Sequence, residues 1–328
     1  MAEAFQAAFI LQNLEPKDIR TLIGIELGMR RFQFVPLEQI AFYAKLPRDE
    51  VIYRLDRLYK MGILDTSHKQ KRDYCLINAS YDVLAFNAFY QKKVLASIGS
   101  EIGMGKESQV FIGLMPDDKK CAVKIHRLGA PSFRQVRKLR NYIQNRKHIS
   151  WLYINRLSAE SEFEGLVRVY ELHLNTPKPI AQNRNSLVMQ LFEGQQLNSF
   201  RELDNPKEIL DEILQYVFRF FTEAKIIHCD LSEFNILIDQ KQQINIIDFP
   251  QWEPANHYNW KYYLMRDLQN ISAFFERRFN LNVDIDSFLK DIKEPSELLN
   301  ENDLQKMDMN SISNSEKGKN PDSINFFQ

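Results

Sequence analysis

The chain of 328 residues has little cysteine and no long hydrophobic run. Its three cysteines, Cys75, Cys121 and Cys229, are odd in number and widely scattered, which excludes a disulfide framework and a cysteine-rich metal cluster. A membrane-spanning helix needs about 18 or more consecutive apolar residues, and no such stretch occurs. The first residues carry Glu3 and no basic segment before their apolar part, so no signal peptide is predicted. We therefore expect a soluble, cytoplasmic protein in a reducing compartment, without a membrane partner.

Net charge is the second thing that the sequence lacks. The 43 Lys and Arg balance 43 Asp and Glu, which excludes a protein that binds by bulk charge, and the 44% apolar content excludes wholesale disorder. The balance hides two unlike regions. Residues 119–159 contain eleven Lys or Arg and no Asp or Glu, whereas residues 284–328 contain ten Asp or Glu and five Lys. The first region predicts a contact with RNA phosphates, the alternative being a solvated loop, and residues 293–328 are expected to form a disordered acidic tail.

The first part of the chain predicts short helices followed by a hairpin. Helices are expected at residues 16–31, 36–44 and 47–61, and strand-like segments at 63–66 and 74–78 flank a basic, polar tip. This pattern is typical of a winged helix, which we assign to residues 1–78, followed by a linker helix at 79–97. The apolar face of the third helix is predicted to hold Val51, Ile52, Leu55, Leu58 and Tyr59.

Two groups of basic residues are candidate nucleic-acid contacts. In the winged helix, the exposed face of the third helix and the hairpin tip carry Arg48, Arg54, Arg57, Lys60, Lys69, Lys71 and Arg72. The alternative for this module is a surface that contacts protein. In the acid-free region the candidate RNA contacts include Arg134, Arg137, Lys138 and Arg140, with aromatic residues among them.

The most informative motif is HCDLSEFNILIDQKQQINIIDF, which begins at His228. The segments ILI and INII can pair as a hairpin around DQKQ, and that pairing places Asn235 beside Asp248. One carboxylate and one carboxamide on adjacent strand ends make an oxygen site that Mg²⁺ takes when nucleotide phosphates supply further ligands. Asp230 would then orient a hydroxyl group or a water. The order of an aspartate, an asparagine five residues later and a metal-binding aspartate is typical of kinase-type phosphoryl transfer.

Upstream features agree with this interpretation. Lys124 lies in the strand-like CAVKI, where a kinase places the lysine that holds the phosphates, and Glu162 in a helical segment is its expected ion-pair partner. A glycine-containing turn between two strands is expected to cradle phosphates with its backbone and the Ser108 hydroxyl. The segment VMQLFEGQQL resembles a hinge that faces adenine, although Met189 could equally be core filling. The candidate ATP-binding residues of the turn and hinge are Gly103, Gly105, Lys106, Glu107, Ser108, Met189, Gln190 and Phe192.

Taken together, GMGKES, CAVKIHRLG, SWLYINRLSAESEF, HCDLSEFNILI and IDFPQ resemble the RIO family of atypical protein kinases, and the winged helix resembles that of its second subfamily. The resemblance covers residues 1 to about 292. It implies Asp230 as the catalytic aspartate, Asn235 and Asp248 as metal ligands, ATP and Mg²⁺ as cofactors, and Asp248 as a possible phosphate acceptor. It also implies a role in maturation of the small ribosomal subunit. Cys229 departs from the family, which usually has Gly or Ala there.

The sequence therefore predicts an α+β protein, with an N-terminal winged helix and a compact, two-lobed kinase-like domain at residues 98–292. Phe249-Pro250 follows Asp248, and no Ala-Pro-Glu or room for an activation loop follows, which disfavours a general peptide kinase. We expect a monomeric serine/threonine kinase or ATPase that binds small-subunit precursors, their rRNA and assembly proteins. The alternatives are a nucleotide-binding scaffold with little turnover, a RIO kinase of the subfamily without the winged helix, and a small-molecule phosphotransferase.

Overall fold

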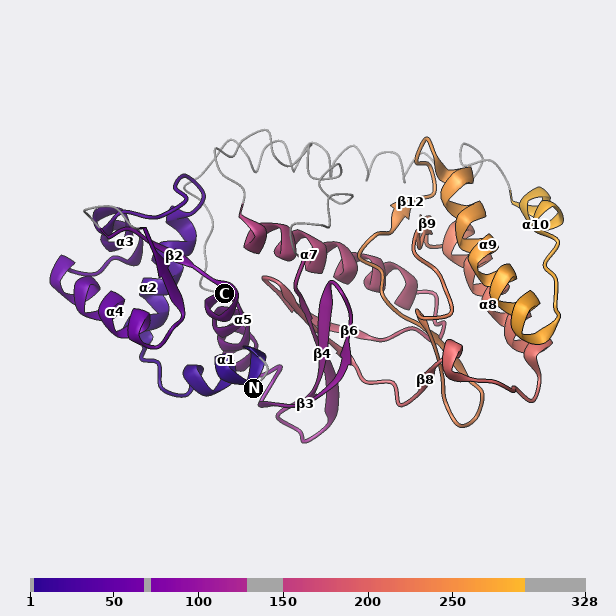
Figure 1. Cartoon of the computed structure of the whole chain (residues 1–328), viewed down its shortest axis with the longest axis horizontal. Coiled ribbons are helices and arrows are strands. Elements are labelled where there is room, and N and C mark those ends of the chain that lie inside the picture. Colours follow the sequence, from indigo (N-terminus) through magenta and orange to yellow (C-terminus); the bar gives the residue numbers. More distant parts are fainter. Residues whose placement is uncertain (1–2, 68–71, 129–149, 293–328) are drawn as a thin grey trace. The chain divides into compact units, whose positions relative to one another are not determined.

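The computed structural model describes residues 3–67, 72–128 and 150–292, and its elements group into two compact units (Figure 1). Unit 1 comprises Met1–Phe200 and Glu233–Trp252, and unit 2 comprises Arg201–Ser232 and Glu253–Gln328. The mixed helix and sheet content confirms the predicted α+β class. The candidate RNA contacts Arg134, Arg137, Lys138 and Arg140, the hairpin residues Lys69 and Lys71, and the predicted tail lie outside the described residues.

The N-terminal elements of unit 1 follow the predicted order of helices and a hairpin. They are α1 (Glu3–Leu11), α2 (Pro16–Gly28), α3 (Leu37–Ala44), α4 (Arg48–Lys60), β1 (Leu64–Thr66), β2 (Tyr74–Leu76) and α5 (Asn78–Gln91). Pro16 occupies the first position of α2, where its missing N–H costs nothing. Helix α2 ends at Gly28, where a side chain has no room because a Cβ would meet Val35 Cγ1 at 2.3 Å. Helix α1 was not predicted, and the linker helix, predicted at 79–97, is α5 and ends at Gln91.

The predicted exposure of Arg54 and Arg57 on α4 is wrong. Arg54 is only 6% exposed, and its guanidinium contacts Glu15 at 2.7 Å and Glu50 at 2.7 Å. Arg57 pairs with the fully buried Asp18. Both arginines therefore face the start of α2, where carboxylates cap the helix, and their guanidinium groups are engaged there in ion pairs. Conversely, Ile52 and Tyr59, predicted in the apolar face, are 42% and 41% exposed.

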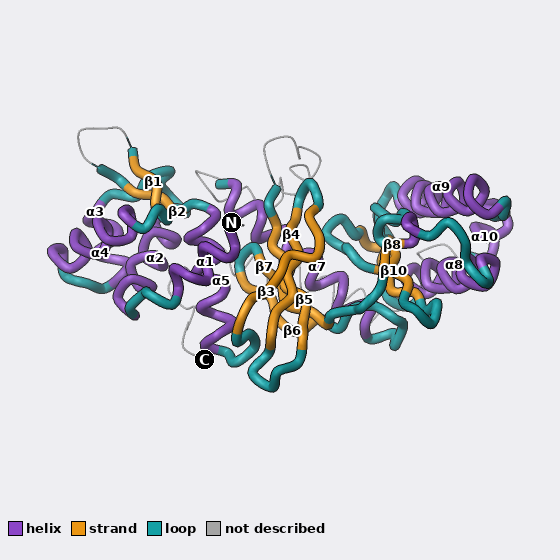
Figure 2. The backbone as a smooth tube through the Cα atoms, turned by 60° about the horizontal axis from the view of Figure 1, so that its bottom comes forward, coloured by secondary structure: helices purple, strands orange, loops and turns teal. Residues whose placement is uncertain are grey.

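A five-stranded antiparallel sheet forms the centre of unit 1 (Figure 2). Its order is β3-β4-β5-β7-β6, with β3 at Ser97–Met104, β4 at Ser108–Leu114, β5 at Lys120–His126, β6 at Pro179–Asn183 and β7 at Ser186–Gln190. Helix α7 (Trp151–Tyr170) packs against β5, β6 and β7. Its N-cap is Ser150, whose side chain accepts a hydrogen bond from the Tyr153 N–H at 3.3 Å.

The central strand β5 has two different faces. Because successive side chains of a strand point to opposite faces, Cys121, Val123 and Ile125 lie on one side and Ala122, Lys124 and His126 on the other. The first three residues belong to a hydrophobic core that continues through the winged helix. That core also includes Phe111 of β4, whose ring contacts Phe5 of α1 edge to face at 5.8 Å. One face of the sheet is thus covered by the N-terminal helices, which leaves the other face for α7 and the polar residues.

Two ion pairs reinforce the connection between the N-terminal helices and the sheet. Arg184, in the turn between β6 and β7, contacts Glu26 of α2 at 2.6 Å. Arg127, directly after β5, pairs with the buried Asp82 of α5. Asp82 also accepts a hydrogen bond from Asn185 at 2.9 Å. The N-terminal helices and the sheet therefore share both apolar packing and ion pairs.

The remaining elements divide between the two units. Unit 1 also contains β8 (Gln195–Gln196), the 3-10 helix η1 (Leu197–Ser199), β10 (Ile236–Ile238) and β11 (Ile244–Ile246). Unit 2 contains α8 (Pro206–Thr222), β9 (Ile226–Ile227), β12 (Glu253–Pro254), α9 (Trp260–Phe279) and α10 (Ile285–Asp291). Within the described ranges, no helix has both the length and the hydropathy that a membrane span requires.

The buried cluster around Arg54 makes a stability prediction. Arg54→Met removes one of the two cations of the Asp18 carboxylate while Arg57 remains, and we expect it to lower the free energy of unfolding by about 1.5–3 kcal/mol, the cost of a lost hydrogen bond to a charged group. Arg48→Met on the same helix is the control, because Arg48 makes one exposed pair with Glu38, and its effect should stay within about 0.5 kcal/mol. Urea unfolding measures both. Equal losses in the two variants would contradict the assigned role of Arg54.

Candidate active site

The site is organised by one buried lysine. Lys124 of β5 is 4% exposed, and its Nζ lies 2.7 Å from Glu162 Oε1 on α7 and 2.7 Å from Asp248 Oδ1, which follows β11. This confirms in geometry the predicted pairing of Lys124 with Glu162. It also adds Asp248 as a second carboxylate, which the spacing of the motifs did not predict.

Two further side chains orient Glu162. His126 Nε2 lies 2.8 Å from the second oxygen of Glu162, a close contact without the alignment of a linear hydrogen bond. The other ring nitrogen of His126 lies 3.0 Å from Ser158 Oγ. Lys124 and His126 alternate on a strand, and Ser158 and Glu162 are four residues apart on a helix, so each pair lies on one face. The sequence analysis did not identify His126 and Ser158 as site residues. The signals that could have found them are the K-x-H spacing from Lys124 and the S-x3-E spacing to Glu162.

The charges in this cluster stabilise one another. Burial alone would lower the pKa of Lys124, but the carboxylates of Asp248 and Glu162 outweigh burial and raise that pKa above its ordinary value. Burial alone would raise the pKa of Glu162, but Lys124 and His126 outweigh it and hold that pKa below its usual range. Lys124 and Glu162 are therefore charged at neutral pH, in an interior where unpaired charges are costly.

The predicted hairpin brings Asn235 and Asp248 together. Strands β10 and β11 pair antiparallel with Ile236 opposite Ile246, and the Ile247 N–H donates to the Asn235 carbonyl at 3.0 Å. Asp248, the next residue, has a left-handed backbone with φ of 73° and a side chain that is 31% exposed. No group of three or more His, Cys, Asp or Glu in the described ranges could hold a metal ion. Asn235 and Asp248 carry oxygen donors, which would suit a Mg²⁺ ion that takes its other ligands from phosphates and water.

The glycine-containing turn lies between β3 and β4. Gly103 is still in β3, opposite Val110, and the Gly105 N–H donates to the Ser108 carbonyl at 2.8 Å. Neither glycine has a positive φ, and a Cβ on Gly105 would lie 3.6 Å from its nearest neighbour, an ordinary contact. The protein's own packing thus does not require glycine here, which is consistent with space kept for a ligand. Lys106 is exposed and Glu107 is half-buried.

Strand register places the other ATP-site candidates on the Lys124 face. Ser108 pairs with His126, and Met189 pairs with Ala122. Paired residues share a face, so Ser108 and Met189 lie on the same side of the sheet as Lys124, which favours Met189 as a pocket wall. Gln190 ends β7, and its N–H donates to the Lys178 carbonyl at 2.9 Å. Only its carbonyl can then serve as the predicted hinge contact, with the backbone of Phe192.

The loop that carries Asp230 belongs to unit 2, where the buried Asp267 of α9 organises it. Asp267 accepts hydrogen bonds from the Cys229 N–H at 2.7 Å and the Leu231 N–H at 3.2 Å. Arg266 donates to the Cys229 carbonyl. Cys229 has a φ of 64°, a left-handed conformation that suits glycine. The hydrogen bonds that Asp267 and Arg266 make with its backbone stabilise this strained conformation. The proximity of Asp230 to Asn235 and Asp248 stays a prediction, because these residues belong to different units.

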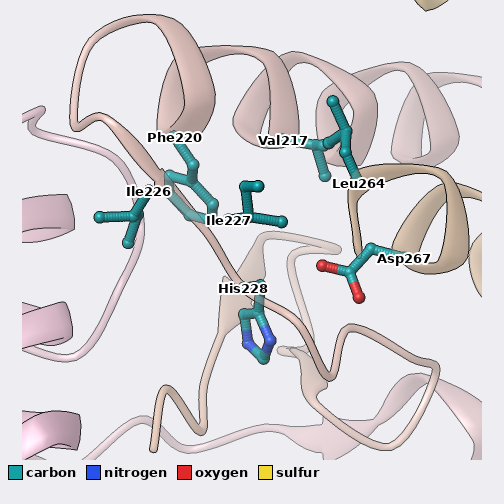
Figure 3. Close-up of a pocket in the computed structure, with 7 residues that line it drawn as sticks. All are labelled: Val217, Phe220, Ile226, Ile227, His228, Leu264 and Asp267. Atoms are coloured by element: carbon teal, nitrogen blue, oxygen red, sulfur yellow. The ribbon is translucent and has the colours of Figure 1, made fainter. Parts of the chain in front are cut away.

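A small cavity lies behind this loop in unit 2 (Figure 3). Its walls are mainly apolar side chains of α8, β9 and α9, and the polar groups at its edge are His228 and Asp267. Burial raises the pKa of Asp267 to about 7, although the two backbone N–H groups and Arg266 oppose that rise. The cavity thus borders Asp267, the residue that holds the Asp230 loop, and the ATP-site candidates do not line it.

The sheet with its helix, the buried lysine between two carboxylates, and the series Asp230, Asn235 and Asp248 define a protein-kinase-like class of fold and site. Comparison with known proteins agrees. The model of the RIO domain matches residues 109–288, and the model of the Rio2 N-terminal domain matches residues 11–92. The chain therefore belongs to the RIO family, with a Rio2-type N-terminal domain ahead of its RIO domain.

Individual relatives cover most of this chain. It is 37% identical over 254 residues to the RIO-type serine/threonine-protein kinase Rio2 of Methanocaldococcus jannaschii, an alignment that covers 76% of this chain and 92% of that protein. It is 34% identical over 270 residues to the serine/threonine-protein kinase rio2 of Dictyostelium discoideum, covering 82% of this chain and 52% of that protein. The chain thus spans about half the length of the second relative.

A solved structure shows the same fold. The crystal structure of the Rio2 kinase-ADP/Mg²⁺-phosphoaspartate complex from Chaetomium thermophilum matches with a TM-score of 0.73 and 33% sequence identity. The match covers 84% of this chain and 85% of that one. The sequence resemblance to the second RIO subfamily is confirmed by these relatives.

Asp267 gives the stability of the protein a specific pH dependence. Its pKa is about 7 in the folded protein and about 4 in an unfolded chain, so the folded state binds the proton more tightly. The contribution of Asp267 to the free energy of unfolding should therefore fall, by on the order of 2–4 kcal/mol, as pH rises from about 4 to about 7, and stay constant above. Asp267→Asn should remove this slope, as measured by urea unfolding across that range. The control is Asp286→Asn, because Asp286 on α10 is exposed, and this variant should keep the pH dependence of the wild type. Equal pH dependence in the wild type and Asp267→Asn would refute the assignment.

Proposed function

We propose that this protein is an ATP- and Mg²⁺-dependent serine/threonine protein kinase with ATPase activity that acts in late maturation of the small ribosomal subunit. The observation that carries the catalytic part is the buried Lys124, fixed between Glu162 and Asp248, with Asn235 brought beside Asp248 by strand pairing. The names of its Rio2 relatives and the ADP and Mg²⁺ in the Chaetomium complex support the same activity.

We assign each residue a proposed role. Lys124 binds the nucleotide phosphates, and Glu162 keeps the ammonium pointed toward them. Asn235 and Asp248 supply two of the oxygen ligands of Mg²⁺, an ion that neutralises charge on the phosphates. Asp230 orients the acceptor hydroxyl or water for in-line attack. Catalysis of this kind depends mainly on positioning and electrostatic stabilisation.

Two acceptors for the phosphoryl group are compatible with the site. A serine or threonine hydroxyl can attack the γ-phosphorus, losing its proton to Asp230 while ADP leaves. Alternatively, an Asp248 carboxylate oxygen can attack, which forms an acyl-phosphate bond as the bond to the ADP oxygen breaks, and water later hydrolyses that bond. The phosphoaspartate in the Chaetomium complex supports the second route.

As partners we propose a small-subunit precursor, its rRNA and assembly proteins, which the protein would bind as a monomer in the cytoplasm. It rests on the resemblance and on the basic, acid-free residues 119–159. The winged helix supports RNA binding less than the sequence suggested, because Arg54 and Arg57 form ion pairs within it. Protein contact through that module remains the alternative to RNA contact.

The second candidate is a scaffold in which nucleotide binding only stabilises a shape. The shared core of winged helix and sheet is compatible with it, because that core joins the two parts into one folded body. Catalytic turnover is favoured over a scaffold role because every predicted catalytic position holds a competent residue, namely Lys124, Asp230, Asn235 and Asp248. A small-molecule phosphotransferase explains neither the winged helix nor the acid-free region.

Two substitutions separate the chemical step from nucleotide binding. Asp230→Ala should abolish ATP hydrolysis while ATP binding largely survives, because Asp230 orients the acceptor only. Asp248→Ala should weaken binding of Mg·ATP itself. Calorimetric titration with Mg·ATP and release of radiolabelled phosphate measure the two effects, and Asp211→Ala, an exposed residue of α8, is the control. Phosphate release by Asp230→Ala at the wild-type rate would disprove its catalytic role.

The chemistry of the label distinguishes the acceptors. After incubation with γ-labelled ATP, label on Asp248 should be released by hydroxylamine, which cleaves acyl phosphates, and should be absent from Asp248→Asn. Label that survives hydroxylamine would identify a serine or threonine acceptor instead.

The ribosomal part needs its own measurement. ATP hydrolysis should change when purified small-subunit precursors are added, and crosslinking in cells should enrich small-subunit rRNA. Hydrolysis in neither condition would support the scaffold. Absence of rRNA from the crosslinks would remove the ribosomal proposal while leaving the catalytic one intact.

A further inference from the structure

The segment that follows Asp248 is bound to α7, the helix that carries Glu162. Phe249 is fully buried. The Trp252 indole Nε1–H donates to the Ser161 carbonyl at 2.8 Å, and the Ser161 hydroxyl donates to the Pro250 carbonyl at 3.1 Å. Ser161 directly precedes Glu162. The two carboxylates that hold Lys124 are thus joined a second time, through their neighbours in the chain.

The helix surface is shaped to receive the indole ring. A Cβ on Gly165 would lie 2.7 Å from Trp252 Cδ1 and 3.0 Å from Phe249 Cβ, closer than packed atoms approach. Arg168, one turn further along α7, covers the same ring with its guanidinium 4.9 Å from the ring centre. Gly165 lies inside α7, at a position where alanine would be favoured by about 1 kcal/mol, and the close approach of Trp252 and Phe249 explains why glycine stands there.

We propose that Trp252 and Ser161 are positioning residues that hold Asp248 and Glu162 in register around Lys124, so that the metal-binding aspartate is preset before nucleotide arrives. This proposal rests on the proposed function for the role of Asp248. In many protein kinases the segment after the metal-binding aspartate is ordered by activation-loop phosphorylation. Here unmodified side chains make the connection within four residues of Asp248.

A general packing role would make a different prediction. If Trp252 served only to fill space, its loss would lower stability and would weaken nucleotide binding with and without metal to the same degree. If it presets Asp248, its N–H and the Ser161 hydroxyl matter for the metal-dependent part of binding. That part is the ratio of the dissociation constant of ADP without MgCl₂ to that with MgCl₂.

The test uses the full chain with ADP as probe, titrated calorimetrically with and without MgCl₂. Trp252→Phe keeps an aromatic ring but removes the indole N–H, and Ser161→Ala removes the hydroxyl. Each should reduce the metal-dependent ratio about threefold to tenfold, the equivalent of one neutral hydrogen bond. Metal-free ADP affinity should stay within about twofold. Trp151→Phe, at the exposed start of the same helix, is the matched control and should change neither quantity.

A measurement without nucleotide keeps the proposal separable from the proposed function. Amide hydrogen exchange of residues 247–252 in the ligand-free chain should speed up in Trp252→Phe and Ser161→Ala, but not in Trp151→Phe. Faster exchange with an unchanged metal-dependent ratio would overturn the positioning role. Wild-type protein that shows no metal-dependent gain in ADP affinity would instead refute the proposed function.

A double-mutant cycle tests the fit of Gly165 to Trp252. Gly165→Ala alone should reduce the metal-dependent ratio, because the new methyl group displaces the indole. Added to Trp252→Ala, the same change should cost less than it does alone, because only the close approach to Phe249 then remains and the effects of residues in contact are not additive. Thermal unfolding verifies that each variant is folded. Full additivity would show that Gly165 acts independently of Trp252 and would contradict the proposal.

Discussion

The Lys124 ammonium is almost completely removed from water, and this constraint determines much of the molecule around it. A buried cation is tolerated only where opposite charges compensate its lost hydration. Here the compensation comes from Glu162 on α7 and Asp248 after β11, both at 2.7 Å. Strand, helix and hairpin must therefore meet at one point, and the sheet cannot slide relative to α7 without breaking an ion pair.

The other polar contacts of unit 1 keep those elements in place. His126 continues the cluster toward Ser158, and Trp252 with Ser161 joins the residues next to the two carboxylates. In unit 2 the Asp230 loop has an equivalent support, in which Asp267 bonds the backbone on either side of Asp230. Each unit thus uses a side chain of a helix, Ser161 of α7 or Asp267 of α9, to fix a short segment that carries a candidate functional aspartate.

Sequence reasoning predicted the features that depend on local order. The hairpin pattern was enough to place Asn235 beside Asp248, and the strand pattern placed Lys124. It failed where the partner lies far along the chain. Arg54 has the spacing of an exposed helix residue, but Asp18, 36 residues earlier, draws it inward. The fit of Gly165 to Trp252 leaves no periodic signal, and the positive φ of Cys229 is set by bonds from α9. These features follow from tertiary contacts, which a single sequence does not specify.

The hydrophobic core that runs from the N-terminal helices into the sheet makes the sheet a shared middle layer. Strand β5 presents Val123 and Ile125 to that core and Lys124 to the opposite face, so the same backbone serves both parts. Removal of the N-terminal helices would uncover a row of apolar side chains that includes Phe111. The winged helix is therefore not an appendage that could be exchanged freely between proteins. It covers the apolar face of the sheet, and any sequence that replaced it would need a matching apolar surface.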